Sequence, residues 1–100
     1  HFTVDQDFEK VIRHCKLVER AFQDGTWITN DMENAYIQLN KLGFAHSIEV
    51  RNEQNELVGG LYGILIGKVF FGESMFHLES NTSKLAFHYL INTYPVIVEF

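Results

Sequence analysis

A carboxylate and a hydroxyl interrupt an apolar run in the second half of the chain. Glu73 and Ser74 lie within VFFGESMF (69–76). An ionised carboxylate that is buried without a partner is costly, so Glu73 needs a partner or a ligand in these surroundings. Four glycines lie in the same region: Gly59, Gly60, Gly63 and Gly72. Glycine inside a strand marks a bulge, a bend or a closely approaching ligand. Together these residues predict a site around Glu73.

Other kinds of chemistry find little support in the residue spacing. The five histidines match no zinc motif, and the chain contains neither a phosphate-binding loop nor a GxSxG nucleophile elbow. We therefore expect no metal and no cofactor. Ser74 follows Glu73 inside a strand, where a nucleophile is not expected, and Glu49 is interpreted as an exposed strand residue. Cys15 lies on an apolar helix face, which favours a small buried side chain over a reactive thiol.

The site is carried by a predicted β-hairpin. Leu57 to Ile66 and Val69 to Phe76 are almost wholly apolar, as in strands that are buried on both faces. Gly67 and Lys68 stand between them, and glycine suits the first position of a type II′ turn. The preceding stretch 46–51 alternates apolar and polar residues and predicts a strand with one polar face. These segments form an antiparallel meander of three strands.

Helices are expected to pack on this meander. Apolar residues recur at helical spacing over 5–23, with Asp5 or Thr3 as the cap, and again from Asn30 to a stop at Gly43. A third helix, 82–94, is apolar nearly all round, which predicts burial between layers. Pro95 ends it.

A final strand, 96–100, is reached through that third helix, so it should lie parallel to a neighbouring strand. The order of elements predicts an α+β fold with a mixed, mostly antiparallel sheet.

The length, composition and net charge of the chain limit the classes of protein to which it can belong. One hundred residues, of which 46% are hydrophobic, predict a single domain over 1–100 with a packed core. The net charge of −5 argues against a chain that grips nucleic acid phosphates by itself. No apolar run is long enough for a membrane span, and a single cysteine suits a cytoplasmic location. Because the chain opens at His1 and stops inside a strand, we expect a piece of a longer protein.

Several segments together resemble one family, the leucyl/phenylalanyl-tRNA–protein transferases. The matching segments are GTWIT (25–29), AY (35–36), LGFAHSIEV (42–50), ELVGGLYG (56–63), FFGESMF (70–76) and NTSK (81–84). The resemblance implies a catalytic domain with a fold similar to the GNAT acetyltransferases. Members of the family continue into a strand with an Asp-Cys-Gln motif, whereas this chain has PVIVEF at 95–100. The resemblance therefore implies a catalytic domain that is truncated at its C-terminal side.

The resemblance also implies roles for individual residues. Trp27 and Tyr36 fall where the family contacts the terminal adenosine of the tRNA and its surroundings. Leu61, Phe70 and Met75 fall on the pocket for the aminoacyl side chain. Gly72 and Glu73 fall near the reacting ester, with Glu73 as the catalytic residue that orients an ammonium group.

The implied activity is transfer of Leu, Phe or Met from the 3′ end of an aminoacyl-tRNA. The acceptor is a protein whose N-terminal residue is Arg or Lys, and the product is marked for bacterial protein degradation. Two alternatives remain open. One is a non-catalytic module that binds apolar side chains or cationic N-termini. The other is an acyl-CoA-dependent N-acetyltransferase, although the segment before the third helix lacks the glycine of a pyrophosphate loop.

Overall fold

The computed structural model describes residues 1–22 and 29–100 of the chain. The elements are β1 (Phe2–Val4), α1 (Phe8–Phe22), α2 (Asn30–Lys41), β2 (Ala45–Arg51), β3 (Leu57–Ile66), β4 (Val69–His77), α3 (Thr82–Thr93) and β5 (Ile97–Glu99). The strands form one sheet in the order β1-β2-β3-β4-β5. All neighbouring pairs are antiparallel except β4 and β5, which are parallel. The predicted α+β fold with a mixed, mostly antiparallel sheet is confirmed.

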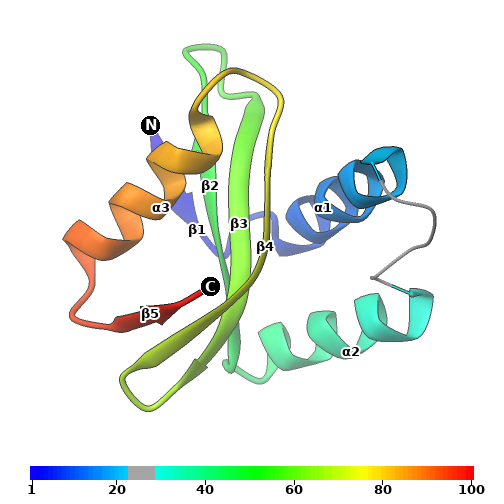
Figure 1. The fold of residues 1–100 in the computed structure, drawn as a ribbon, viewed down its shortest axis with the longest axis vertical. Helices are drawn as coiled ribbons and strands as arrows, with labels where there is room; N and C mark the ends of the chain where they lie inside the picture. The colour runs from blue at the N-terminus through cyan, green and yellow to red at the C-terminus, as the bar shows by residue number, and fades with distance from the viewer. Residues whose placement is uncertain (23–28) are drawn as a thin grey trace.

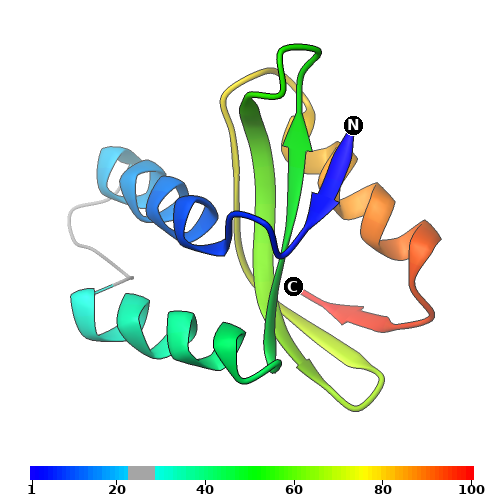
Figure 2. The same ribbon diagram turned by 180° about the vertical axis from the view of Figure 1, so that it is seen from behind.

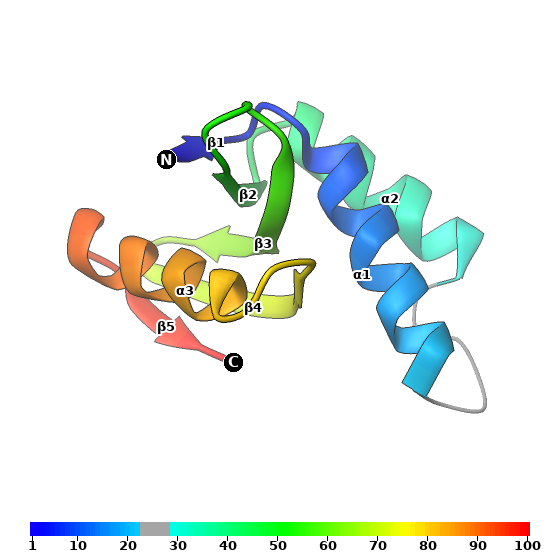
Figure 3. The same ribbon diagram turned by 90° about the horizontal axis from the view of Figure 1, so that it is seen from above.

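The helices cover the two faces of the sheet unequally. Figures 1 and 3 show α1 and α2 on one face and α3 alone on the other. An α1-side cluster of buried residues comprises Phe8, Val11, Ile12, Cys15, Ala45, Tyr62 and Phe76. An α3-side cluster comprises Ile48, Val50, Val58, Leu61, Phe70, Ala86 and Leu90. Neighbouring residues of β3 thus alternate between the clusters, as side chains of a strand must.

The central hairpin forms as its sequence predicts. β3 and β4 pair from Ile66 and Val69 outward, and Gly67 in the turn has a φ of +59°. At Gly59, near the other end of β3, glycine is required because a neighbouring side chain is too close for a Cβ atom. A Cβ atom there would lie 2.2 Å from the Oγ1 atom of Thr82, the first residue of α3. The absence of a side chain lets α3 begin directly against the sheet.

The first strand was not predicted from the sequence. Thr3 pairs with Glu49 in β1, and α1 begins only at Phe8, so neither Thr3 nor Asp5 caps the helix as predicted. Figure 2 shows β1 at the edge of the sheet, beside β2. The chain then turns through Asp5, whose φ of +57° is left-handed. The N-terminal segment is therefore part of the sheet rather than the start of a helix.

The prediction that α3 is buried between layers is wrong. Only Thr82, Ser83, Ala86 and Leu90 of this helix are buried. Leu85 and Ile91 are 48% and 47% exposed on the outer face. The helix packs on the sheet with one face, because no second layer lies over it within the described part of the chain. In residues 1–22 and 29–100, no helix is long and apolar enough to span a membrane.

Candidate functional site

Glu73 lies at an irregularity of strand β4. Gly63 pairs with Gly72 and Tyr62 pairs with Ser74, so Glu73 is an extra residue without a pairing partner on β3. This is the two-against-one arrangement of a β-bulge, a feature that re-aims side chains and is frequent next to active sites. A bulge was one of the three explanations that the sequence left open for the glycines of this hairpin. Glu73 is exposed and therefore available to a ligand.

Tyr36 of α2 is the described partner of this carboxylate. Its ring packs edge-to-face on Tyr62, with centroids 5.4 Å apart and an interplanar angle of 71°. Burial, followed by the charge of Glu73 and a side-chain hydrogen bond to Glu73, raises the pKa of Tyr36 from 10.0 to about 12. The hydroxyl therefore stays protonated at neutral pH and donates to Glu73. The contact places Glu73 on the sheet face that carries α2.

The bulge also explains how residues five positions apart share a face. Phe70 belongs to the α3-side cluster, and Met75 packs against the same cluster. An odd separation in a regular strand would place the two side chains on opposite faces. The extra residue at Glu73 restores Met75 to the face of Phe70, opposite Leu61 of β3. The three residues predicted to form one apolar pocket therefore lie on the same face of the sheet.

Gly72 lies beside Glu73, directly after the part of β4 that pairs with β5. The ring of Phe100 rests on its backbone: a Cβ atom at this position would lie 2.2 Å from that ring. The pairing of β4 with β5 involves only Val69, Phe70 and Phe71. No described strand therefore pairs with the outer edge of β4 from Gly72 onward.

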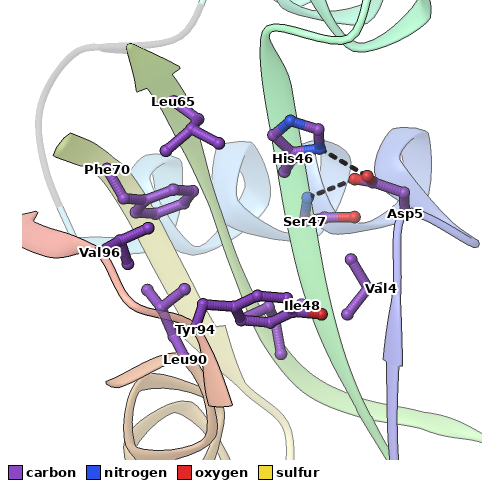
Figure 4. A pocket seen from close by; sticks show the side chains of 10 residues that line it. All are labelled: Val4, Asp5, His46, Ser47, Ile48, Leu65, Phe70, Leu90, Tyr94 and Val96. Atoms are coloured by element: carbon purple, nitrogen blue, oxygen red, sulfur yellow. Dashed lines mark hydrogen bonds and ion pairs between the residues drawn. The ribbon is translucent and has the colours of Figure 1, made fainter. Parts of the chain in front are cut away.

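A pocket of about 250 Å³ opens on the α3 side of the sheet (Figure 4). It is lined by Val4, Asp5, His46, Ser47, Ile48, Leu65, Phe70, Leu90, Tyr94 and Val96. Leu65, Phe70 and Val96 lie on one side of it, and His46 and Asp5 on the other. Of the residues predicted to line an apolar pocket, only Phe70 is a wall of this one. Leu61, which is fully buried, and Met75 lie elsewhere in the cluster.

An imidazole and a carboxylate form the polar side of the pocket. Nδ1 of His46 lies 2.6 Å from Oδ2 of Asp5, and the backbone N–H of Ser47 donates to Oδ1 over 2.8 Å. Tyr94 closes the rim, and its pKa is raised by burial first and by Tyr89 and Asp5 in addition. The sequence reasoning missed this pair, because Asp5 was interpreted as a helix cap and His46 was tested only as a metal ligand. Nothing in the sequence signalled their contact across 41 positions.

The interpretation of Glu49 as an exposed residue is wrong. Its side chain is completely buried. Thr3 donates to Oε1 over 2.6 Å, the backbone N–H of Gln6 donates to the same atom, and Ser47 donates to Oε2. β1 and the segment that leads into α1 cover the face of β2 that the alternation predicted to be polar and exposed. Glu49 thus joins β1 to β2 and stays away from the pocket.

The predicted site residues therefore separate into two groups. Tyr36 and Glu73 meet on the α2 side, whereas Leu61, Phe70 and Met75 share the α3 side, and Gly72 lies at the strand edge between them. Trp27 lies outside the described residues. The predicted burial of Cys15 is confirmed.

A family model with the description "Leucyl/phenylalanyl-tRNA protein transferase" matches residues 1–95. The chain belongs to this family. A leucyl/phenylalanyl-tRNA–protein transferase of Lawsonia intracellularis is 57% identical over 88 residues, which are 88% of this chain and 38% of the relative. One from Saccharophagus degradans is 60% identical over 85 residues, or 85% of this chain and 34% of the relative. The chain thus spans about a third of the length of these transferases.

Solved structures with a similar fold have distant sequences. A putative acetyl transferase from Pyrococcus furiosus has a TM-score of 0.58 at 14% identity over the whole chain and 83% of the other protein. A Bacillus halodurans protein has a TM-score of 0.60 at 12% identity, covering 80% of its length. These likenesses concern the fold alone, and they agree with the GNAT-like architecture that the resemblance implied for this part of a transferase.

Proposed function

We propose that this chain handles the aminoacyl group in an enzyme that transfers Leu, Phe or Met from aminoacyl-tRNA to a protein. The acceptor in this proposal is an α-amine of an N-terminal Arg or Lys. The observation that carries the proposal is the exposed carboxylate of Glu73, which the β4 bulge and the Tyr36 hydroxyl hold beside Gly72. Membership of the transferase family supports the reaction class.

The proposed reaction requires little covalent chemistry from the protein. An aminoacyl ester is already activated, so the enzyme must hold the ester and the amine together and manage one proton. Glu73 has a carboxylate to orient an ammonium group, of either the donor or the acceptor. Tyr36 keeps that carboxylate in place, because its hydroxyl is protonated at neutral pH and donates to Glu73.

The apolar pocket suits the donor side chain. An apolar cavity of about 150 Å³ is enough for benzene, so a pocket of about 250 Å³ has room for the ring of Phe or the branched end of Leu. Its aliphatic and aromatic walls reject polar side chains but separate apolar ones only by roughly 1–3 kcal/mol per methylene. This is consistent with a small set of accepted donors.

The two groups of residues are close together along β4. Phe70, on the α3 side, and Glu73, on the α2 side, are three positions apart on the same strand, with Gly72 between them. In this proposal the donor side chain lies near Phe70, and its amine lies near Glu73.

The test is Glu73→Gln in the full-length protein that contains this chain. Transfer of Phe from Phe-tRNA to a peptide with N-terminal Arg should fall by about 10²-fold or more in kcat/KM, the range for a positioned proton-handling group. Glu53→Gln, an exposed glutamate in the β2–β3 turn, is the matched control and should leave the rate unchanged. A Glu73→Gln variant as active as wild type would refute the proposal. Acetyl-CoA in place of the tRNA distinguishes the acetyltransferase alternative.

A further inference from the structure

Helix α2 carries Tyr36 but is weakly anchored by apolar packing. None of the residues in Asn30–Lys41 is buried. Tyr36, Ile37 and Leu39 pack only partly against the α1-side cluster, and Met32 is 40% exposed. Such a helix can shift against the sheet at small cost in buried apolar area. Its position must therefore depend strongly on polar contacts at its ends.

The first of these contacts comes from a buried lysine. Lys16 of α1 is only 8% exposed, although lysine is almost never buried unless it is paired. Its ammonium donates to Oδ1 of Asn30, and Nζ lies 3.6 Å from Oε2 of Glu33. Arg13 completes the group, with Nε 3.6 Å from Oε1 of Glu33. Two cations of α1 thus hold the first turn of α2.

The second contact fixes the other end of the helix. The amide of Asn40 donates to the backbone oxygen of Ala45 over 3.0 Å and to Asp5 over 3.3 Å. Glu33, Tyr36 and Asn40 are spaced by three and four residues, so they share one face of α2. Tyr36 therefore stands between two polar anchors, and a shift of either anchor moves its hydroxyl relative to Glu73.

We propose that Lys16 is a positioning residue, whose ammonium ties the first turn of α2 to α1 and so sets the Tyr36 hydroxyl against Glu73. An apolar residue of similar length at position 16 would fill the same space. It could not fix the turn of α2 at a defined point, because apolar contacts have no direction. The anchoring depends only on the geometry of α1 and α2. Its effect on catalysis rests on the function proposed for Glu73.

The test is Lys16→Met in the full-length protein with ¹³C-labelled tyrosine, where Tyr36→Phe assigns the Tyr36 signal. We expect the pKa of Tyr36 to fall from about 12 toward 10, since the hydroxyl loses both burial and Glu73. The value of kcat should fall about 10- to 100-fold, the size expected for a small misplacement of a catalytic group. Lys16→Arg, which keeps the cation, should restore most of both values.

The controls separate anchoring from general destabilisation. Lys10→Met makes the same chemical change on the exposed side of α1 and should leave the Tyr36 titration unchanged. If Lys16→Met fails to fold, Glu33→Gln removes the charge that pairs with Lys16 and Arg13 from the α2 side, while the contact of Lys16 with Asn30 remains. An unchanged Tyr36 pKa in the folded variant would overturn the proposal. A shifted pKa with an unchanged transfer rate would support the anchor and contradict the role of Glu73 instead.

Discussion

The hydroxyl of Tyr36 on α2 hydrogen-bonds to the carboxylate of Glu73 at the β4 bulge. The two residues are 37 positions apart in the sequence, and neither lies in the fully buried core. The contact joins the extra residue of the β4 bulge to a helix in which no residue is buried.

Tyr36→Phe tests whether this hydrogen bond matters for transfer. The variant keeps the ring that packs edge-to-face on Tyr62, so the folded state should lose little stability. Glu73 loses a donor and gains rotational freedom, which should lower kcat about tenfold or more. Steady-state transfer kinetics and a thermal melt of the same variant provide the measurement. An unchanged kcat would show that Glu73 acts without the hydroxyl.

Alkaline pH should weaken the fold through the same tyrosine. The pKa of Tyr36 is about 12 in the folded chain against 10.0 in the unfolded one, so the folded state holds this proton more tightly. The corresponding stability is fully present below pH 10 and is lost as the pH rises toward 12. Urea midpoints across this range should therefore fall. Tyr36→Phe should remove part of the decrease, and Tyr94→Phe another part, because the pKa of Tyr94 is also raised.

Ser47→Ala tests the buried carboxylate of Glu49. Ser47 and Thr3 donate their hydroxyls to its two oxygens in a completely buried position. Removing one donor leaves part of the charge unsatisfied, which should cost about 1–3 kcal/mol in the free energy of unfolding. Chemical denaturation measures the loss. The exposed Ser80→Ala serves as the comparison and should lie within error of wild type. Equal free energies of unfolding for the two variants would mean that the buried carboxylate of Glu49 does not need the hydroxyl of Ser47.

Local sequence patterns were enough to predict the long helices and strands. The hairpin followed from two apolar runs around Gly67, and α2 followed from helical spacing between Asn30 and Gly43. β1 is three residues long, too short for any periodicity to appear, so the strand was not predicted and Thr3 was considered only as a possible cap of the following helix. The burial of the outward face of α3 was predicted wrongly for a related reason. Its composition is apolar nearly all round, and a sequence does not tell whether a second layer covers a helix.

The candidate site was only partly accessible to the same reasoning. Glu73 was found because a carboxylate in an apolar, glycine-rich run needs an explanation. The partner of Glu73 could not be found, because the contact with Tyr36 depends on how α2 packs on the sheet. Glu49 was misjudged for the same reason: alternation marks a polar face, but only the path of β1 and the start of α1 decides whether water reaches it.

The bulge at Glu73 has a consequence for length variation in this protein. A single deletion between Phe70 and Met75 would return β4 to strict alternation, and every residue after it would exchange the two sides of the sheet. Phe76 would then leave the α1-side cluster, and Met75 would leave Leu61. Insertions and deletions of one residue in this segment should therefore be far less tolerated than substitutions. The count of residues here matters as much as their identity.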